Sequence, residues 1–185
     1  MQVKKEEKKK SIVSAAIKLL AERGIEKVST SDIAREARVG KGTIYVYFRS
    51  KEDLLREVAN EVYGSFTKDL RESLRASGSL DRFIDMLVNR ILENVQVRGR
   101  LLYMLHRYFK GENEAYQTFQ KEYREALEKA FLKFKDELGI KFDELHFFIT
   151  SFLMSSYILS RDIEIERIKE IVKRGLKSLL MRTYK

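Results

Sequence analysis

The sequence predicts an all-α protein of about nine helices, and three observations support this fold class. Apolar residues recur with helical periodicity along most of the 185 residues. No stretch alternates convincingly between apolar and polar residues, as a half-buried strand would. Glycines and small polar clusters near residues 78, 99, 111, 139 and 161 divide the chain into lengths suited to helices.

The first predicted helix covers about residues 8–22. Its apolar face is formed by Ile12, Ala15, Ala16, Leu19 and Leu20. Gly24 stands where a left-handed residue would end the helix. The preceding segment, MQVKKEEKKK, is too polar to pack. We expect either a mobile arm whose five lysines lie along an anionic partner or the solvated start of the first helix.

Two short helices follow, joined by a turn at residues 38–41. Ser29 and Asp32 form a capping-box-like start for the second helix, whose apolar residues include Ile33 and Ala34. The third helix covers residues 42–48. Two short helices joined by a four-residue turn are typical of a helix-turn-helix.

A long fourth helix begins after Ser50, which has the same spacing to Asp53 as Ser29 has to Asp32. Its apolar residues run from Leu54 to Leu70. The remaining helices are predicted at about residues 80–97, 100–109, 113–137, 142–160 and 163–182.

Charge and composition narrow the function. Residues 1–50 carry 12 Lys/Arg against 6 Asp/Glu, so most of the net charge of +9 lies at the amino end and favours an anionic partner there. The chain has no cysteine, which excludes disulfides and thiolate metal sites. Its longest apolar stretch, residues 145–159, is shorter than the roughly 20 residues of a spanning helix. We expect a cytoplasmic protein with no membrane partner.

The Gly40-Lys41 pair does not fit a nucleotide-binding loop. Such a loop needs a glycine five residues earlier, after a buried strand, and Arg35 stands there inside a predicted helix. A helical wheel instead predicts that Ile44 and Phe48 of the third helix face the core. Its outer face carries Gly42, Thr43 and Val46, flanked by Tyr45 and Tyr47.

This small, nearly uncharged face suits the major groove of double-stranded DNA. Gly42 permits close approach, Thr43 can bond a base edge, and Val46 can meet a thymine methyl group. Predicted phosphate contacts come from the flanking Tyr45 and Tyr47, from Lys41 and Lys51, and from Ser29 and Thr30 at the start of the second helix. Tyr45 and Tyr47 taken singly are equally well explained as half-buried core aromatics.

Residues 12–55 resemble the DNA-binding domain of the TetR family of transcriptional repressors. The resemblance rests on Ala-Glu-Arg-Gly, Asp-Ile-Ala, Lys-Gly-Thr-Ile-Tyr-Val-Tyr-Phe and Ser-Lys-Glu-Asp-Leu, in the family's order and spacing. It implies a homodimer with a DNA-reading domain at residues 1–50. A helical domain at residues 51–185 would bind a small molecule and thereby release DNA.

By this resemblance, Lys41, Tyr47, Lys51 and Thr30 fall at phosphate-contacting positions, and Gly42, Thr43 and Tyr45 at positions that face bases. Three departures stand out. Arg38 replaces a glycine of the turn and must tolerate its backbone conformation. Gly40 replaces a serine cap, and Val46 stands where His or Tyr is usual.

The carboxy-terminal part predicts two further properties. A stripe along residues 165–179, with the apolar segment 145–159, predicts a homodimer formed through the last two helices. Aromatic residues favour a small apolar effector, for which the candidate binding residues are Phe66, Tyr103, His106, Tyr123 and Phe148.

Two alternatives stay open. If the interior is fully packed, the protein would be a dimeric DNA-binding architectural protein without an effector. A small helical enzyme using His106 or His146 is the weaker alternative, because no catalytic set of side chains stands out. We therefore expect no enzyme activity, no cofactor and no metal site.

Overall fold

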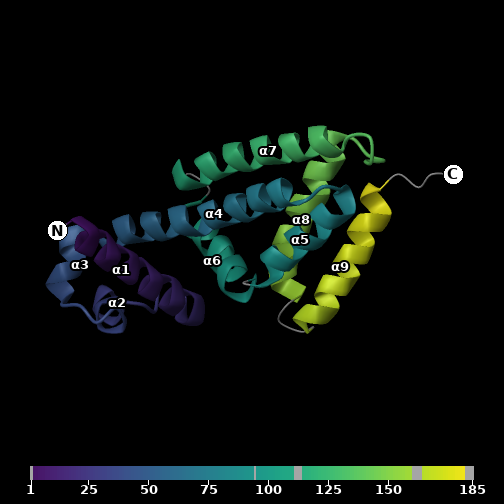
Figure 1. Ribbon diagram of the computed structural model, residues 1–185. Coiled ribbons are helices and arrows are strands. Elements are labelled where there is room, and N and C mark those ends of the chain that lie inside the picture. Colours follow the sequence, from purple (N-terminus) through teal and green to yellow (C-terminus); the bar gives the residue numbers. More distant parts are fainter. Residues whose placement is uncertain (1, 94, 111–113, 160–163, 182–185) are drawn as a thin grey trace.

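The computed structural model describes residues 2–93, 95–110, 114–159 and 164–181, and these form nine helices (Figure 1). Their bounds are α1 Gln2–Arg23, α2 Thr30–Glu36, α3 Lys41–Tyr47, α4 Lys51–Ala76, α5 Leu80–Glu93, α6 Val95–Tyr108, α7 Glu114–Phe134, α8 Phe142–Leu159 and α9 Ile165–Leu180. The predicted all-α class is confirmed. Among the described helices, none has the length and apolar character needed to cross a bilayer.

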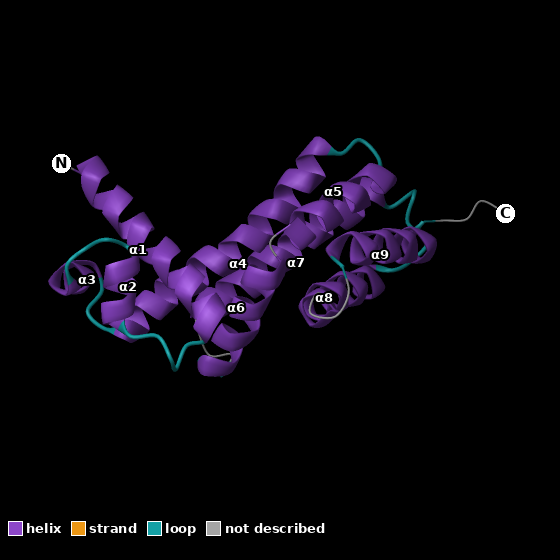
Figure 2. Ribbon diagram, turned by 90° about the horizontal axis from the view of Figure 1, so that it is seen from below, coloured by secondary structure: helices purple, strands orange, loops and turns teal. Residues whose placement is uncertain are grey.

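The long helix α4 joins the two ends of the molecule. Helices α1, α2 and α3 gather at one end, and α4 runs from them towards α5, α8 and α9, with α7 alongside (Figure 1). Figure 2 shows α8 and α9 side by side at the end opposite α1–α3. Buried side chains form one hydrophobic cluster from Ile12 to Leu180. The core is therefore continuous through both predicted parts.

Both predicted helix caps are present. The Ser29 hydroxyl accepts a hydrogen bond from the Asp32 backbone N–H at 3.1 Å, and the Ser29 N–H donates to the Asp32 carboxylate at 3.0 Å. The Ser50 hydroxyl accepts from the Asp53 N–H at 3.0 Å. Each cap pairs a free N–H at a helix start, which fixes where α2 and α4 begin.

The turn between α2 and α3 contains Arg38 at the position where the resemblance leads us to expect glycine. Arg38 has a φ of 55°, in the left-handed region. A non-glycine residue there brings its Cβ close to the following carbonyl oxygen, so this turn stores some strain.

The predicted start of the first helix was wrong. Helix α1 begins at Gln2 rather than near residue 8, so the described part of the lysine-rich segment is helical; Met1 lies outside the described residues. Lysine and glutamate are good helix formers, and extending an existing helix needs no new nucleation. The segment is thus the solvated start of α1.

The predicted break near residue 99 was also wrong. Helix α5 ends at Glu93 and α6 begins at Val95, so Gly99 lies inside α6, where it is buried. A buried glycine within a helix leaves room for a neighbouring element and does not by itself end the helix.

Candidate nucleic-acid interface and interior cavity

Helix α3 has the two faces that the helical wheel predicted. Ile44 and Phe48 are buried, with 1% and 4% of their surfaces exposed. On the outer side, Val46 is 70% exposed and Tyr45 is 48% exposed. Gly42 is also exposed, and a Cβ built on it would meet nothing within 4 Å. Space for a close partner therefore lies directly in front of this face.

The hydroxyl groups of Thr30 and Tyr45 lie 3.3 Å apart and share a hydrogen bond. Thr30 is the first residue of α2, and Tyr45 lies in the middle of α3. The bond ties the start of one helix to the exposed face of the other. The Tyr45 ring thus points towards the start of α2, while Thr43, two residues earlier on α3, is partly exposed.

Ser29 is occupied by its capping role. Its hydroxyl accepts from the Asp32 N–H and donates to the Asp32 carboxylate, which also pairs with Arg35 at 2.7 Å. The side-chain and backbone hydrogen bonds from Ser29, with Arg35 nearby, lower the pKa of Asp32 below its ordinary range. In this arrangement the Ser29 hydroxyl hydrogen reaches a phosphate only if the capping box opens.

The two predicted lysines lie in different surroundings. Lys51 donates from Nζ to the backbone carbonyl of Ile25 at 2.7 Å, which fastens the start of α4 to the loop after α1. Lys41 is exposed at the start of α3 and has no partner in the described part of the chain. Tyr47 is partly buried, with its ring 6.4 Å from that of Phe48.

Helix α6 and helix α4 connect this end of the molecule to the other. Arg100 of α6 donates to the backbone carbonyl of Glu22 in α1 at 3.3 Å, and Lys9 of α1 pairs with Glu57 of α4 at 2.6 Å. Deeper in the molecule, the buried Asp69 of α4 pairs with Arg98 of α6. Burial raises the pKa of the Asp69 carboxyl, and Arg98 offsets part of this effect.

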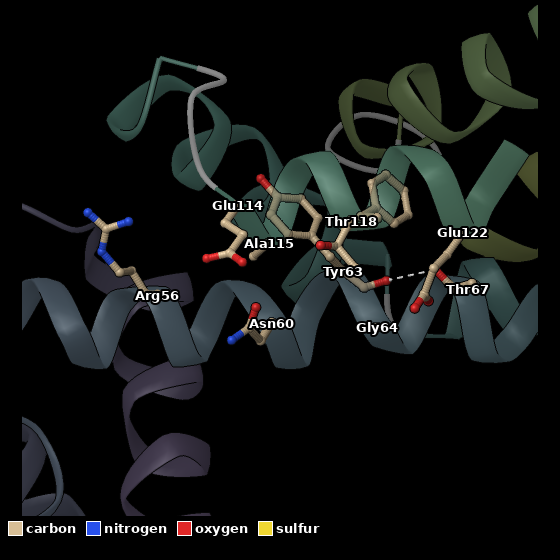
Figure 3. Close-up of a pocket in the computed structure, with 10 residues that line it drawn as sticks. Arg56, Asn60, Tyr63, Gly64, Thr67, Glu114, Ala115, Thr118 and Glu122 are labelled. Carbon is tan, nitrogen blue, oxygen red and sulfur yellow. Dashed lines mark hydrogen bonds between the residues drawn. The ribbon is translucent and has the colours of Figure 1, made fainter.

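A cavity of about 420 Å³ lies between α4 and the first half of α7 (Figure 3). Its lining residues are Arg56, Asn60, Tyr63, Gly64, Thr67, Glu114, Ala115, Thr118, Phe119 and Glu122. Tyr63, Thr67 and Phe119 are buried and form its floor, while most of the other lining residues are exposed at its rim. Its volume falls within the range of small-molecule sites, roughly 300–1,000 Å³.

The Tyr63 hydroxyl is the most unusual polar group of this cavity. The side chain is only 1% exposed, and its Oη has no hydrogen-bond partner among the described residues. Burial raises the pKa of this phenol well above its ordinary value, so the hydroxyl keeps its proton and can donate. Buried hydroxyls in proteins usually have a partner, so an unpaired one indicates a place that another group can fill.

A chain of aromatic rings leads away from the floor. The Tyr63 ring stacks on Phe119 at 5.2 Å and lies 5.7 Å from Tyr116, which is 4.8 Å from the ring of His106. Phe119 in turn stacks on Tyr123 at 5.4 Å. The His106 Nδ1 atom is buried and, like the Tyr63 hydroxyl, has no partner among the described residues.

None of the five residues predicted for an effector lines this cavity. Tyr123 and His106 belong to the ring chain, Phe66 is buried in α4, and Phe148 packs partly against the core. Tyr103 is 50% exposed, with the guanidinium of Arg107 over its ring.

Sequence reasoning missed the cavity residues of α4. A signal was present: Asn60, Tyr63 and Thr67 put polar groups at helical spacing on one side of a helix otherwise rich in buried apolar residues. Among the described residues, no group of three or more His, Cys, Asp or Glu side chains lies close enough together to hold a metal ion.

The predicted stripe of α9 divides between two faces. Ile168 and Leu176 are buried within the molecule, at 1% and 6% exposed. Ile171 and Leu179 are about half exposed, at 47% and 51%, and Phe147 of the neighbouring α8 is 64% exposed. Large apolar side chains thus remain uncovered on both of the last two helices.

Helix packing and the exposed face of α3 together define a helix-turn-helix protein. Residues 12–58 match the family model "Bacterial regulatory proteins, tetR family". Residues 12–58 are therefore a helix-turn-helix segment of the TetR family, which confirms the resemblance read from the motifs.

Among curated proteins, the fatty acid metabolism regulator protein of Bacillus subtilis is 32% identical over 79 residues, which are 43% of this chain and 41% of that protein. The chain thus spans about two fifths of the length of this relative. Among solved structures, a regulator from Saccharomonospora viridis in complex with choline aligns with a TM-score of 0.77, at 17% identity over 96% of this chain and 100% of the other. FadR from Bacillus subtilis in complex with stearoyl-CoA aligns with a TM-score of 0.67, at 18% identity over 90% and 96%. At these identities the two structures show the shared fold.

Proposed function

We propose that the protein is a ligand-responsive transcriptional repressor that binds a palindromic DNA operator as a homodimer and is released by a small effector. Residues 1–50 serve as the DNA-reading domain and residues 51–185 as the effector-binding and dimerisation domain. The observation that carries the proposal is the outer face of α3, which is small, uncharged and exposed in the most basic part of the chain.

In this proposal α3 enters the major groove. Gly42, Thr43 and Tyr45 face the bases, and Val46 meets a thymine methyl group. The proposed phosphate contacts are Thr30, Lys41, Tyr47 and Lys51, and also Ser29 once its capping box opens. Lys51 can serve while bonded to Ile25, because an ammonium group has three N–H donors and the carbonyl uses one.

Dimerisation is proposed through α8 and α9. The uncovered Phe147, Ile171 and Leu179 support this assignment, since a second copy would remove their apolar surface from water. A protein with two-fold symmetry binds a palindromic DNA site. Its two half-sites are separated by one turn of the DNA duplex or a multiple of it.

The effector is proposed to be a small, largely apolar molecule bound in residues 51–185. The cavity, with the aromatic rings at its floor, supports this proposal. The relative that regulates fatty acid metabolism and the neighbour that binds stearoyl-CoA add support for an apolar ligand.

The test selects operator sequences from random duplexes and then measures affinities by fluorescence anisotropy at several salt concentrations. Thr43→Ala and Tyr45→Ala are expected to change which bases are preferred. Lys41→Ala is expected to weaken binding to all DNA sequences alike, and to lower by about one the slope of log affinity against log salt concentration. Lys41 is the cleaner phosphate variant because Lys51 also bonds Ile25. Equal losses on operator and random DNA for all three variants would contradict direct readout by α3.

A further inference from the structure

The rim of the α4–α7 cavity carries an excess of negative charge. Two carboxylates, Glu114 and Glu122, lie on its α7 side, and Arg56 is the cationic group of its lining. Arg56 is already paired with Glu52 at 2.6 Å and lies over the ring of Phe109, and Figure 3 shows it at one end of the cavity, apart from the other side chains. These contacts hold the guanidinium at that end, and the two carboxylates of the lining outnumber it.

The two carboxylates are held less closely than Arg56 is, whose pair with Glu52 is 2.6 Å long. Glu114 has no partner in the described part of the chain. Glu122 pairs with Arg71 at 3.6 Å, and both side chains are about 40% exposed, so this pair is weak. Two carboxylates thus remain available to an occupant of the cavity, which favours a positive charge and disfavours a phosphate or a carboxylate.

The floor supplies the second feature that a cation uses. Tyr63 and Phe119 are stacked aromatic rings, and an aromatic face attracts an organic cation through its quadrupole. In Figure 3 the Tyr63 ring is directed towards α7, with its hydroxyl end on the side of Glu114. That hydroxyl has no hydrogen-bond partner among the described residues, so its oxygen lone pairs are free to face a positive charge.

We propose that the α4–α7 cavity binds a small organic cation, with an apolar body against Tyr63 and Phe119 and a positively charged nitrogen between Glu114 and Glu122. This inference rests on the proposed function in one respect only, that the occupant acts as the effector. The inference specifies that the largely apolar effector proposed above also carries a positive charge.

The test is isothermal titration calorimetry of the full chain, without DNA, with two probes of the same shape. Benzyltrimethylammonium carries a quaternary nitrogen, and neopentylbenzene has carbon in its place and no charge. The cation is expected to bind at least tenfold more tightly, and Glu114→Gln combined with Glu122→Gln is expected to reduce this preference to less than threefold.

The matched control is Glu128→Gln. It makes the same change of charge on the same helix, six residues or roughly 9 Å beyond Glu122, outside the cavity lining. This variant is expected to keep the full preference for the cation. Circular dichroism of each variant establishes that the helices are intact before the affinities are compared.

The outcomes separate this inference from the proposed function. Equal binding of both probes, binding of neither, or a preference that survives the loss of both carboxylates would overturn it. Release of operator DNA by the neutral probe alone would also overturn it while supporting the repressor. Carboxylate-dependent binding of the cation that leaves DNA affinity unchanged would support the inference and contradict the effector role.

Discussion

Replacing Tyr63 by phenylalanine is expected to stabilise the unliganded protein. The ring contacts with Phe119 and Tyr116, at 5.2 and 5.7 Å, are kept, and only a buried hydroxyl with no partner among the described residues is removed. Unfolding returns that hydroxyl to water, so its removal should raise the free energy of unfolding by about 1–2 kcal/mol. For a chain of this length, each 1 kcal/mol raises Tm by roughly 2–4 °C. Urea denaturation and calorimetry of ligand-free protein measure both quantities.

Tyr123→Phe is the matched control, because it makes the same change in the same ring chain. Tyr123 is 3% exposed, and its hydroxyl accepts a hydrogen bond from Thr150 at 3.4 Å. This variant is expected to lose about 0.5–1.5 kcal/mol of stability, the usual net contribution of a hydrogen bond. A loss of similar size in both variants would show that the Tyr63 hydroxyl is hydrogen-bonded in solution, and the reasoning about an unfilled site would fail.

Three further outcomes are expected. Arg38→Gly should raise the free energy of unfolding by about 0.5–1 kcal/mol in urea denaturation, because Arg38 has a φ of 55°, whereas Ser31→Gly within α2 should lower it. Ile171→Glu should shift the protein from dimer to monomer in sedimentation velocity, while Leu132→Glu, at a site 66% exposed on α7, should leave the dimer intact. Since the pKa of Asp32 is lowered in the folded state, its stabilising effect is present above the ordinary pKa of 3.8 and is lost as the pH falls through the folded pKa. Asp32→Asn should therefore reduce the acid-side slope of a stability-versus-pH curve, and an unchanged slope would contradict this assignment.

The DNA-reading part of the fold could be predicted because its determinants are local. The Ser29–Asp32 cap is a pair three residues apart, and the two faces of α3 follow from helical spacing once Ile44 and Phe48 are recognised as apolar anchors. Such features depend on neighbours in sequence, and the chain displays them directly. The expectation of an unusual backbone conformation at Arg38, whose φ is 55°, came from the resemblance, in which glycine is usual at that turn position.

The polar positions on one side of α4 are visible in the sequence, but the cavity itself could not be predicted, because it depends on which faces of two distant helices meet. Tyr63 and Phe119 are more than 50 residues apart, and their spacing within α4 and α7 marks both simply as buried aromatics. The five residues predicted for the effector, Phe66 among them, were selected by side-chain type alone. Only the packing of α4 on α7 determines that Tyr63, rather than Phe66, lines an open volume.

Helix α4 is the element through which an occupied cavity would act on DNA binding. The cavity residues of α4 run from Arg56 to Thr67. Glu57, next to the first of them, forms the ion pair with Lys9 of α1. Because a continuous helix is stiff, a displacement at Tyr63 moves Glu57, fewer than two turns away, and the reading domain with it. A tenfold loss of operator affinity needs only about 1.4 kcal/mol of preference for the non-binding arrangement, and DNA must weaken the effector by the same factor. Breaking the Lys9–Glu57 pair with Glu57→Gln should therefore change this coupling while leaving the intrinsic affinity of the cavity for its ligand unaltered, since Glu57 lies outside the cavity lining.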